Sequence, residues 1–490
     1  GLNTTVLPSN FVILSSSDYP LSETLTVTTG SRSGTINANC VFIFGDLSLD
    51  GSNQIVLILS GGLASIIAYF NGVKWKTLQE GIVSNINSAI PSLIILLLVG
   101  ALAGSWMISG IVPSMIYYGI QILSPDIFLL ASCIICIIVS LATGSSWTTS
   151  ATIGIALMGV GKSLGVDDGF IAGAVLSGAY FGDKMSPLSD TTNLAPAVSG
   201  TTLFKHIRYL SYTTIPSIII CLLILLIVGF LFVEPSSFEN SLMVSESIKE
   251  KFFISPILFF PPSVVIFLIY KKVSAIPALF FGVVLGVLFA IIFQSNIIYE
   301  ISLDGRKNWI SIFSGVMISL YGNVSIETSN EMVTDLLTSS GMFGMLSTIW
   351  LIFSAMIFGG AMEKGGFLSK IANTILNKVK STGSLVTSTA GSCIFFNITA
   401  SDQYLSIVIP GKMYSNYYKE RGLAPENLSR TLEDSGTVTS VLVPWNTCGA
   451  YHSSVLGVST LTYLPYCFFN IISPFMTVLF AYLKIKIKRL

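Results

Sequence analysis

Charge is scarce in this chain. Only 10% of its 490 residues are Asp, Glu, Lys or Arg, the formal net charge is zero, and there are two histidines. Soluble domains carry about 25% charged residues, so the composition excludes an ordinary soluble protein. A zero net charge gives no reason to expect nucleic acid as a partner. The seven cysteines lie mostly in apolar runs, and neither histidine has metal-ligand spacing. No cofactor, no transition-metal site and no enzymatic nucleophile–base pair is predicted.

Long apolar runs take the place of charge. Hydrophobic residues make up 52% of the chain, and the mean hydropathy is +0.77. Crossing a bilayer takes about 20 apolar residues. The clearest runs of that length are 53–70, 126–143, 208–233, 252–270, 273–293 and 457–482. The sequence therefore predicts an all-α polytopic membrane protein, with about ten spans, in the cell (inner) membrane.

Basic residues at the ends of these runs predict an orientation. Clusters of Lys and Arg mark the cytoplasmic side of a membrane protein. They occur at Lys74 and Lys76, Lys205 and Arg208, Lys271 and Lys272, and 484–489. By this rule 53–70 runs inward and 273–293 outward, while 208–233 runs outward and 457–482 inward. Matching parts of the two halves thus cross in opposite senses, which is typical of an inverted structural repeat.

The repeat suggests a division of the chain. We expect a first transmembrane repeat at 51–233, a linker at 234–251, a second, inverted repeat at 252–483 and a basic cytoplasmic tail at 484–490. Residues 1–50 are rich in Ser, Thr and Asn and form an atypical polar segment. We interpret that segment as a degraded or altered first span.

Several apolar stretches are interrupted by glycine and polar residues. Residues 91–123 and 347–379 break at 104–110 and 359–366 into arms too short to span, which predicts two re-entrant hairpins. The stretches 125–161 and 169–200 predict broken transmembrane helices, unwound near 143–146 and 183–190. Their counterparts in the second half are 385–418 and 428–450.

Acidic residues lie inside these broken stretches. A carboxylate at the bilayer centre costs roughly 3 kcal/mol on insertion scales, so packing alone would not place one there. An unwound helix offers carbonyl oxygens to a cation, and hydroxyl, amide and carboxylate side chains complete its shell. We predict Na+ and proton binding by Asp183, Asp190, Asp402, Asp434, Thr143, Ser145, Thr437, Asn446 and Thr447. A second group of candidates comprises Glu363, Glu433, Ser146, Thr191, Asn193 and Asn397.

Ordinary structural roles compete with some of these assignments. Asp183 beside Lys184 also fits a surface ion pair at a helix end. Glu433 fits a position near the cytoplasmic end, beside Arg430. Glu363 next to Lys364 fits the tip of a hairpin.

Five motifs carry a family resemblance: LATGSSWTT at 141–149, GAYFGDKMSPLSDTTN at 178–193, DQY at 402–404, LEDSGTVT at 432–439 and PWNTC at 444–448. With these the chain resembles the NhaC family of Na+/H+ antiporters, from about Phe42 to Pro474. The resemblance implies a secondary transporter that exchanges Na+ for H+.

Two other activities stay open. Because the family also includes exchangers of malate and protons for lactate and Na+, a carboxylate–cation antiporter is the first alternative, with Arg430 or Lys184 as countercharge. A passive cation channel is the second. The substrates expected are Na+ and H+, the surroundings are the lipid bilayer, and a homodimer is left open.

Overall fold

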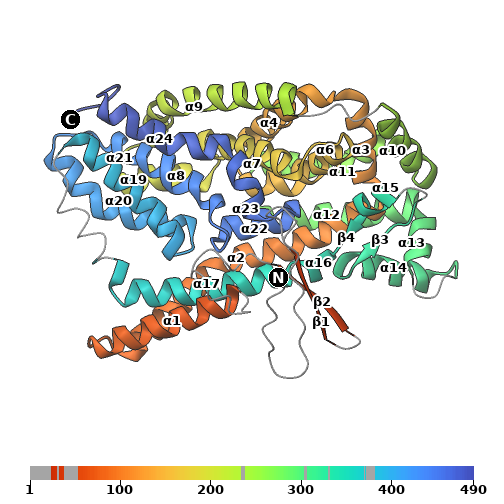
Figure 1. Cartoon of the computed structure of the whole chain (residues 1–490), viewed down its shortest axis with the longest axis horizontal. Coiled ribbons are helices and arrows are strands. Elements are labelled where there is room, and N and C mark those ends of the chain that lie inside the picture. The colour runs from red at the N-terminus through yellow and green to blue at the C-terminus, as the bar shows by residue number, and fades with distance from the viewer. Residues whose placement is uncertain are drawn as a thin grey trace, which may run out of the picture.

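The computed structural model is built almost wholly of helices (Figure 1). It describes residues 24–29, 32–37, 53–232, 238–302, 306–328, 331–368, 370 and 381–490. Two short antiparallel strands, β1 (Thr24–Thr29) and β2 (Arg32–Asn37), pair within the polar N-terminal segment. The apolar span that the repeat requires before residue 50 is not tested, because most of that segment lies outside the described residues.

The helices of the first half follow one another closely. In chain order they are α1 (Asn53–Phe70), α2 (Trp75–Ile108), α3 (Ile111–Ile122), α4 (Pro125–Thr143), α5 (Ser146–Thr149), α6 (Ile155–Ser163), α7 (Asp168–Met185), α8 (Asp190–Ser199) and α9 (Leu203–Phe232). A π-helical turn, Ser150–Gly154, joins α5 to α6.

The second half begins with α10 (Phe238–Lys251), α11 (Phe260–Tyr270), α12 (Ala275–Phe293), α13 (Ser295–Ile301) and α14 (Trp309–Tyr321). A small hairpin of β3 (Val324–Ser325) and β4 (Thr338–Ser339) encloses α15 (Glu331–Leu336). The remaining helices are α16 (Gly341–Gly344), α17 (Leu346–Lys364), α19 (Thr382–Thr399), α20 (Gln403–Glu420), α21 (Pro425–Leu432), α22 (Thr447–Leu456), α23 (Thr460–Tyr463) and α24 (Phe468–Tyr482).

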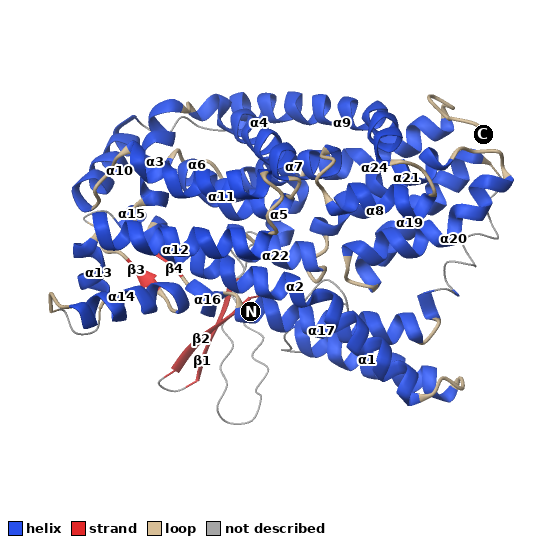
Figure 2. Ribbon diagram, turned by 180° about the vertical axis from the view of Figure 1, so that it is seen from behind, coloured by secondary structure: helices blue, strands red, loops and turns tan. Residues whose placement is uncertain are grey.

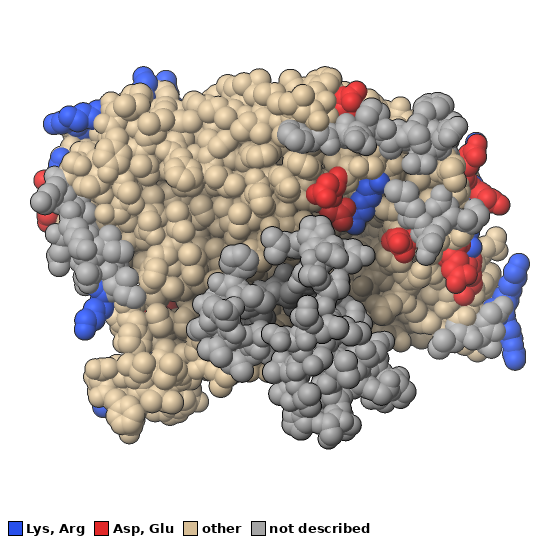
Figure 3. Space-filling view, in the orientation of Figure 1, with Lys and Arg blue, Asp and Glu red and all other residues tan. Residues whose placement is uncertain are grey.

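Length and composition identify the membrane-crossing helices. Among the described residues, five helices are long and apolar enough to span, or up to seven if two bent pairs each count as one. Large apolar side chains are exposed along them; Leu223 and Ile227 on α9 are each 54% exposed. On the face in Figure 3, most of the visible surface is uncharged, and the charged residues lie at the left end and over the right half. The chain is a multi-pass membrane protein.

The long helices run side by side (Figures 1 and 2). Helix α9 lies along one edge, against α4, α7 and α24. Helices α1, α2 and α17 pack together along the opposite edge. Between these edges lie the broken helices, so the polar breaks are enclosed by apolar spans.

The predicted broken helices are confirmed. Helix α4 ends at Gly144, whose φ of 71° closes the helix in the left-handed conformation, and α5 begins at Ser146. The break after α7 covers residues 186–189, at the end of the expected region. In the second half, α19 and α20 are separated around Ser401, which has a φ of 58°. The same order of helix, break and helix thus occurs in both halves, while their inverted relation stays a prediction.

The first predicted hairpin differs in its first arm. Helix α2 is 34 residues long and continues through Gly104, so this arm can span, and the chain turns only at Ser109 and Gly110. A β-carbon on Gly104 would lie 1.8 Å from the carbonyl oxygen of Ser319. The glycine therefore lets a neighbouring helix approach closely and does not break its own helix.

The second predicted hairpin shows the same departure. Helix α17 passes through Gly359 and Gly360 without a break and ends at Lys364. A β-carbon on Gly360 would lie 2.7 Å from the α-carbon of Ile82 on α2. Most of the second arm, from residue 371 to 379, lies outside the described residues.

Two stretches around the predicted linker have structure that the sequence analysis did not foresee. The predicted polar linker contains helix α10, whose Val244 and Ile248 are buried. The apolar segment Pro256–Tyr270, within the predicted span 252–270, meets the preceding helix Met243–Lys251 at an angle of 89°. Prolines cause this, because Pro256, Pro261 and Pro262 cannot donate the hydrogen bonds that would extend α11 toward its N-terminus.

Candidate ion-binding site

The two helix breaks of the first half contact each other. A β-carbon on Gly144 would lie 2.6 Å from the β-carbon of Leu188 in the other break. The hydroxyl of Ser186 donates to the carbonyl oxygen of Leu141 at 2.9 Å. The breaks at 144 and 186–189 thus form one unwound crossing.

Asp183 lies at this crossing. It is 8% exposed, and its carboxylate accepts hydrogen bonds from Ser146 at 2.7 Å and Ser189 at 2.6 Å, one hydroxyl from each break. The hydroxyls compensate part of the cost of burying the carboxylate. Asp183 is therefore held where backbone and side-chain oxygens of two helices converge.

The second half forms a related crossing. The backbone N–H of Thr447 donates to the carbonyl oxygen of Ser401 at 3.0 Å, which joins the break after α19 to the start of α22. The amide of Asn446 donates to both oxygens of Asn397, at 3.0 and 3.1 Å. Asp402, 5% exposed, accepts the backbone N–H of Leu405 and caps α20.

A buried ion pair lies between the two crossings. Lys184, next to Asp183, binds the carboxylate of Asp434, and both side chains are fully buried. The hydroxyl of Ser473 accepts from Lys184 at 2.7 Å and donates to Asp434 at 3.1 Å. Thr213 on α9 donates to the second carboxylate oxygen at 2.8 Å. The surface ion pair of Asp183 with Lys184 considered from the sequence is therefore wrong.

Glu433 lies beside this pair. It begins a π-helical turn, Glu433–Thr437, and is fully buried. Within the described part of the chain, neither carboxylate oxygen of Glu433 accepts a hydrogen bond of ordinary geometry. Lys184, Asp183 and Asp434 all lie within electrostatic range of it.

The sequence also allowed a position for Glu433 near the cytoplasmic end, beside Arg430, and its depth in the membrane stays a prediction. Helix α21 is buried on all sides, because every residue from Glu426 to Leu432 is buried. Glu433 follows α21 directly and is itself fully buried, so its carboxyl is not exposed to solvent.

Amide side chains organise the π-turn. Asn397 donates to the carbonyl oxygen of Gly436 at 2.7 Å, and Gln403 donates to that of Thr437 at 3.1 Å. The hydroxyl oxygens of Thr437 and of Thr143, at the end of α4, are buried without a hydrogen-bond partner among the described residues. Such oxygens are suited to a cation.

The other candidates occupy more ordinary positions. Asp190 and Asn193 are exposed on α8, and the amide of Asn193 donates to the backbone carbonyls of Pro187 and Ser189 in the preceding break. Ser145 caps the N-terminus of α5, and Glu363 forms an ion pair with Lys364. The hydroxyl oxygens of Thr191 and Ser189 are 3.1 Å apart. Asp190 lies within electrostatic range of Asp183 and Tyr404, but it is not enclosed as Asp434 is. The binding roles of these residues stay predictions.

Sequence reasoning missed Thr213 and Ser473, and it gave Lys184 a different role. Single hydroxyls in apolar helices are common, so nothing in the pattern marked the first two. The pairing of Lys184 could have been suspected from the sequence. A lysine inside a segment that lies within the membrane needs a buried acidic partner.

Comparison with known proteins identifies the family of this chain. The model of the Na+/H+ antiporter family matches residues 178–485, which include both halves of the ion pair. The chain belongs to this family. It is 38% identical to the Na+/H+ antiporter NhaC of Alkalihalophilus pseudofirmus, over 88% of this chain and 90% of that protein.

A second relative exchanges different substrates. The chain is 35% identical to the malate-2H+/Na+-lactate antiporter of Bacillus subtilis, over 89% of this chain and 90% of that protein. Among solved structures, the YdaH transporter of Alcanivorax borkumensis aligns with a TM-score of 0.42 and 11% identity, covering 89% of this chain and 99% of that chain.

Proposed function

We propose that this chain exchanges Na+ for H+ across the cell (inner) membrane, as a transporter and not as an enzyme. The observation that carries the proposal is the fully buried pair of Lys184 and Asp434, with Glu433 beside it. Replacing a buried ion pair by apolar residues is often neutral or stabilising, so stability alone is a weak reason for this one. A pair that opens and closes during transport is a stronger reason.

The exchange step follows from competition for one carboxylate. Na+ needs several oxygen ligands, and Asp434 offers its carboxylate together with the hydroxyls of Thr213 and Ser473. Na+ bound there displaces the ammonium of Lys184. A buried charge without a partner is costly, and Lys184 removes that cost by releasing its proton. The return of a proton restores the pair and expels Na+.

The helix breaks supply the rest of the path. Asp183 accepts hydrogen bonds from one hydroxyl in each of the two helix breaks of the first half. The π-turn of the second half contains Glu433 and Thr437. Unwound segments present carbonyl oxygens that a regular helix would use internally. We propose that Na+ passes between these two groups of oxygens, with Asp402, Asn446 and Thr447 at the second crossing.

Exchange of carboxylates is the second candidate, and the malate–lactate relative favours it. A carboxylate substrate needs a basic side chain that is free to bind it, and neither candidate residue meets this need well. Lys184 is already paired with Asp434, while Arg430 lies against the ring of Tyr209, 4.7 Å from its centroid.

Proteoliposomes distinguish these activities. Protein is reconstituted with a pH-sensitive dye inside, and Na+ is added outside with or without malate and lactate. We expect Na+ alone to move protons outward. Proton movement that requires malate or lactate would favour the second candidate, and Na+ entry without proton movement would indicate a channel.

A further inference from the structure

A second polar site lies away from the ion pair, where α9 begins. A cavity of about 400 Å³ is lined by eight described residues: Lys205, Arg208, Tyr209, Tyr212, Glu426, Lys486, Ile487 and Lys488. Four of the eight are basic and one is acidic. Three sequence segments therefore bring positive charge to one small space: the start of α9, the start of α21 and the C-terminal tail.

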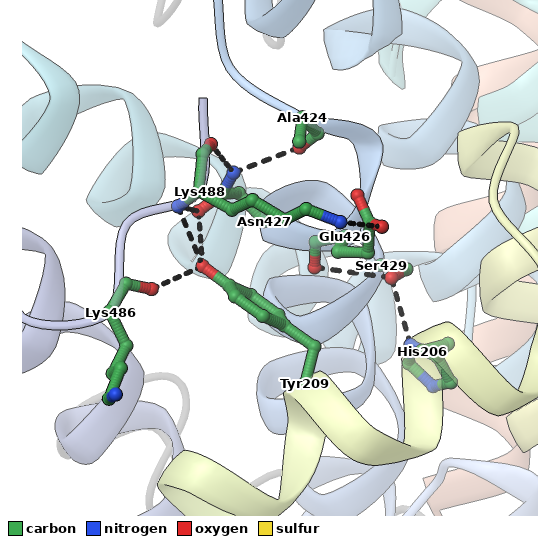
Figure 4. A network of polar contacts seen from close by, with 8 residues as sticks. All are labelled: His206, Tyr209, Ala424, Glu426, Asn427, Ser429, Lys486 and Lys488. Carbon is green, nitrogen blue, oxygen red and sulfur yellow. Dashed lines mark hydrogen bonds and ion pairs between the residues drawn. The ribbon is translucent and has the colours of Figure 1, made fainter. Parts of the chain in front are cut away.

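The folded tail builds this cavity. The backbone N–H of Ala424 donates to the carbonyl oxygen of Lys488 at 3.0 Å, and that of Leu490 donates to Gly422 at 3.0 Å. Tyr209 on α9 donates to Asn427 at 2.6 Å and accepts from the backbone N–H of Lys488 at 3.2 Å (Figure 4). The tail is thus held against both helices, and its lysines occupy defined positions.

Most of the positive charge is available to a ligand. Lys488 binds Glu426 at 2.5 Å, which neutralises the acid (Figure 4). Burial alone would raise the pKa of the Glu426 carboxyl, but the hydrogen bond from Lys488 and the charges of Lys488 and Lys205 hold it below its ordinary value. Within the described ranges, Lys205, Arg208 and Lys486 form no ion pair.

The residues around the cavity indicate which kind of anion it binds. Tyr212, 40% exposed, stands four residues after Arg208 on the same face of α9, and Lys486 lies over its ring at 4.8 Å. The face continues with Ile215, Ile219 and Leu223, which are 47%, 51% and 54% exposed. The basic groups suit the phosphate of a phospholipid, and the tyrosine suits the headgroup level of the membrane. The apolar stripe suits the acyl chains.

We propose that this cavity binds the phosphate of an anionic phospholipid, whose acyl chains lie along the exposed face of α9. Arg208, Lys205 and Lys486 contact the phosphate, and Tyr212 lies at the level of the headgroup. The lipid fastens the tail and the start of α21 to the membrane surface. This site is independent of ion exchange and does not rest on it.

Native mass spectrometry of the full-length, delipidated protein tests the proposal. Phosphatidylglycerol is titrated against phosphatidylcholine with the same acyl chains. The pocket variant carries Lys205→Gln, Arg208→Gln and Lys486→Gln. The matched control carries Lys74→Gln, Lys76→Gln and Lys271→Gln, which removes the same charge from exposed positions elsewhere.

We expect the wild type and the control to bind phosphatidylglycerol at least about tenfold more tightly than phosphatidylcholine, and the pocket variant to lose that difference. Equal losses in both variants would overturn the site, as would no loss in either. Displacement of the lipid by inorganic phosphate at similar concentration would overturn the assignment to a lipid. If the triple variant does not fold, Arg208→Gln and Lys486→Gln are measured singly, and each should weaken binding about threefold.

Discussion

At the scale of single residues, Asp434 is the group on which exchange depends. Asn at this position keeps an oxygen and the volume but can neither carry charge nor take up a proton. We expect Asp434→Asn to abolish Na+-driven proton movement in proteoliposomes. It also leaves Lys184 buried without its partner, so the unfolding free energy should fall by about 3–5 kcal/mol.

Two further variants separate lost chemistry from lost folding. Adding Lys184→Met to Asp434→Asn should restore the thermal midpoint without restoring exchange. Thr213→Val removes one hydroxyl from the carboxylate. It should cost about 1 kcal/mol of stability and raise the Na+ concentration that exchange requires, without abolishing exchange. Exchange at the wild-type rate in Asp434→Asn would remove this residue from the mechanism.

Glu433 gives the second prediction at this scale. If Glu433 were at the surface, Glu433→Gln would have little effect on exchange. The carboxyl is instead fully buried beside the ion pair. Gln cannot exchange a proton, so we expect proton movement to fall at least about tenfold. The thermal midpoint should stay level or rise, since a buried acidic group is removed. Unchanged flux over a series of pH values would show that Glu433 plays no part in exchange.

Much of the site could be predicted from single residues. The carboxylates were visible because charge is rare in this chain, and Asp183, Asp402 and Asp434 are indeed buried. Their partners were not visible, because Asp434 meets a lysine 250 residues away in sequence. Adjacency in sequence had instead suggested Asp183 as the neighbour of Lys184.

At the scale of elements, the unwound crossing explains Gly144. Its φ of 71° disfavours other residues, and a β-carbon would also lie 2.7 Å from the carbonyl carbon of Leu188. Gly200 is a matched control, with a φ of 85° and nothing within 4 Å of its β-carbon position. Both Ala variants share a backbone cost of about 1–2 kcal/mol.

Gly144→Ala should lose a further 1–3 kcal/mol or so from overpacking and most of its exchange activity. Gly200→Ala should retain exchange. Thermal melting and proton flux on the two proteins measure both effects. Equal behaviour of the two variants would show that the crossing tolerates the extra methyl group.

Elements with a local cause were predictable, and elements set by packing were not. The breaks at Gly144 and at 186–189 combine turn residues with polar side chains, and the sequence located both. Gly104 and Gly360 look the same in sequence but lie inside continuous helices, because neighbouring backbones occupy the space of their missing side chains. Only the tertiary structure separates these two uses of glycine.

At the scale of the whole molecule, the inverted repeat predicts which ends share a side of the membrane. Single Lys74→Cys, Lys271→Cys and Lys484→Cys variants should react with an impermeant maleimide only from the cytoplasmic side. Glu250→Cys, on α10, should react only from outside. The six native cysteines in the described part of the chain are buried and should stay unreactive. Labelling of Lys74→Cys and Lys484→Cys from opposite sides would contradict the inverted arrangement.

The central claim is that Na+ and a proton compete for the pair of Lys184 and Asp434. The most direct measurement is proton release from the purified protein in weakly buffered detergent solution when NaCl is added, with choline chloride as the ionic-strength control. We predict that the wild type releases protons on adding NaCl but not choline chloride, and that Asp434→Asn with Lys184→Met releases none. Absence of release by the wild type, or equal release by the double variant, would contradict the account.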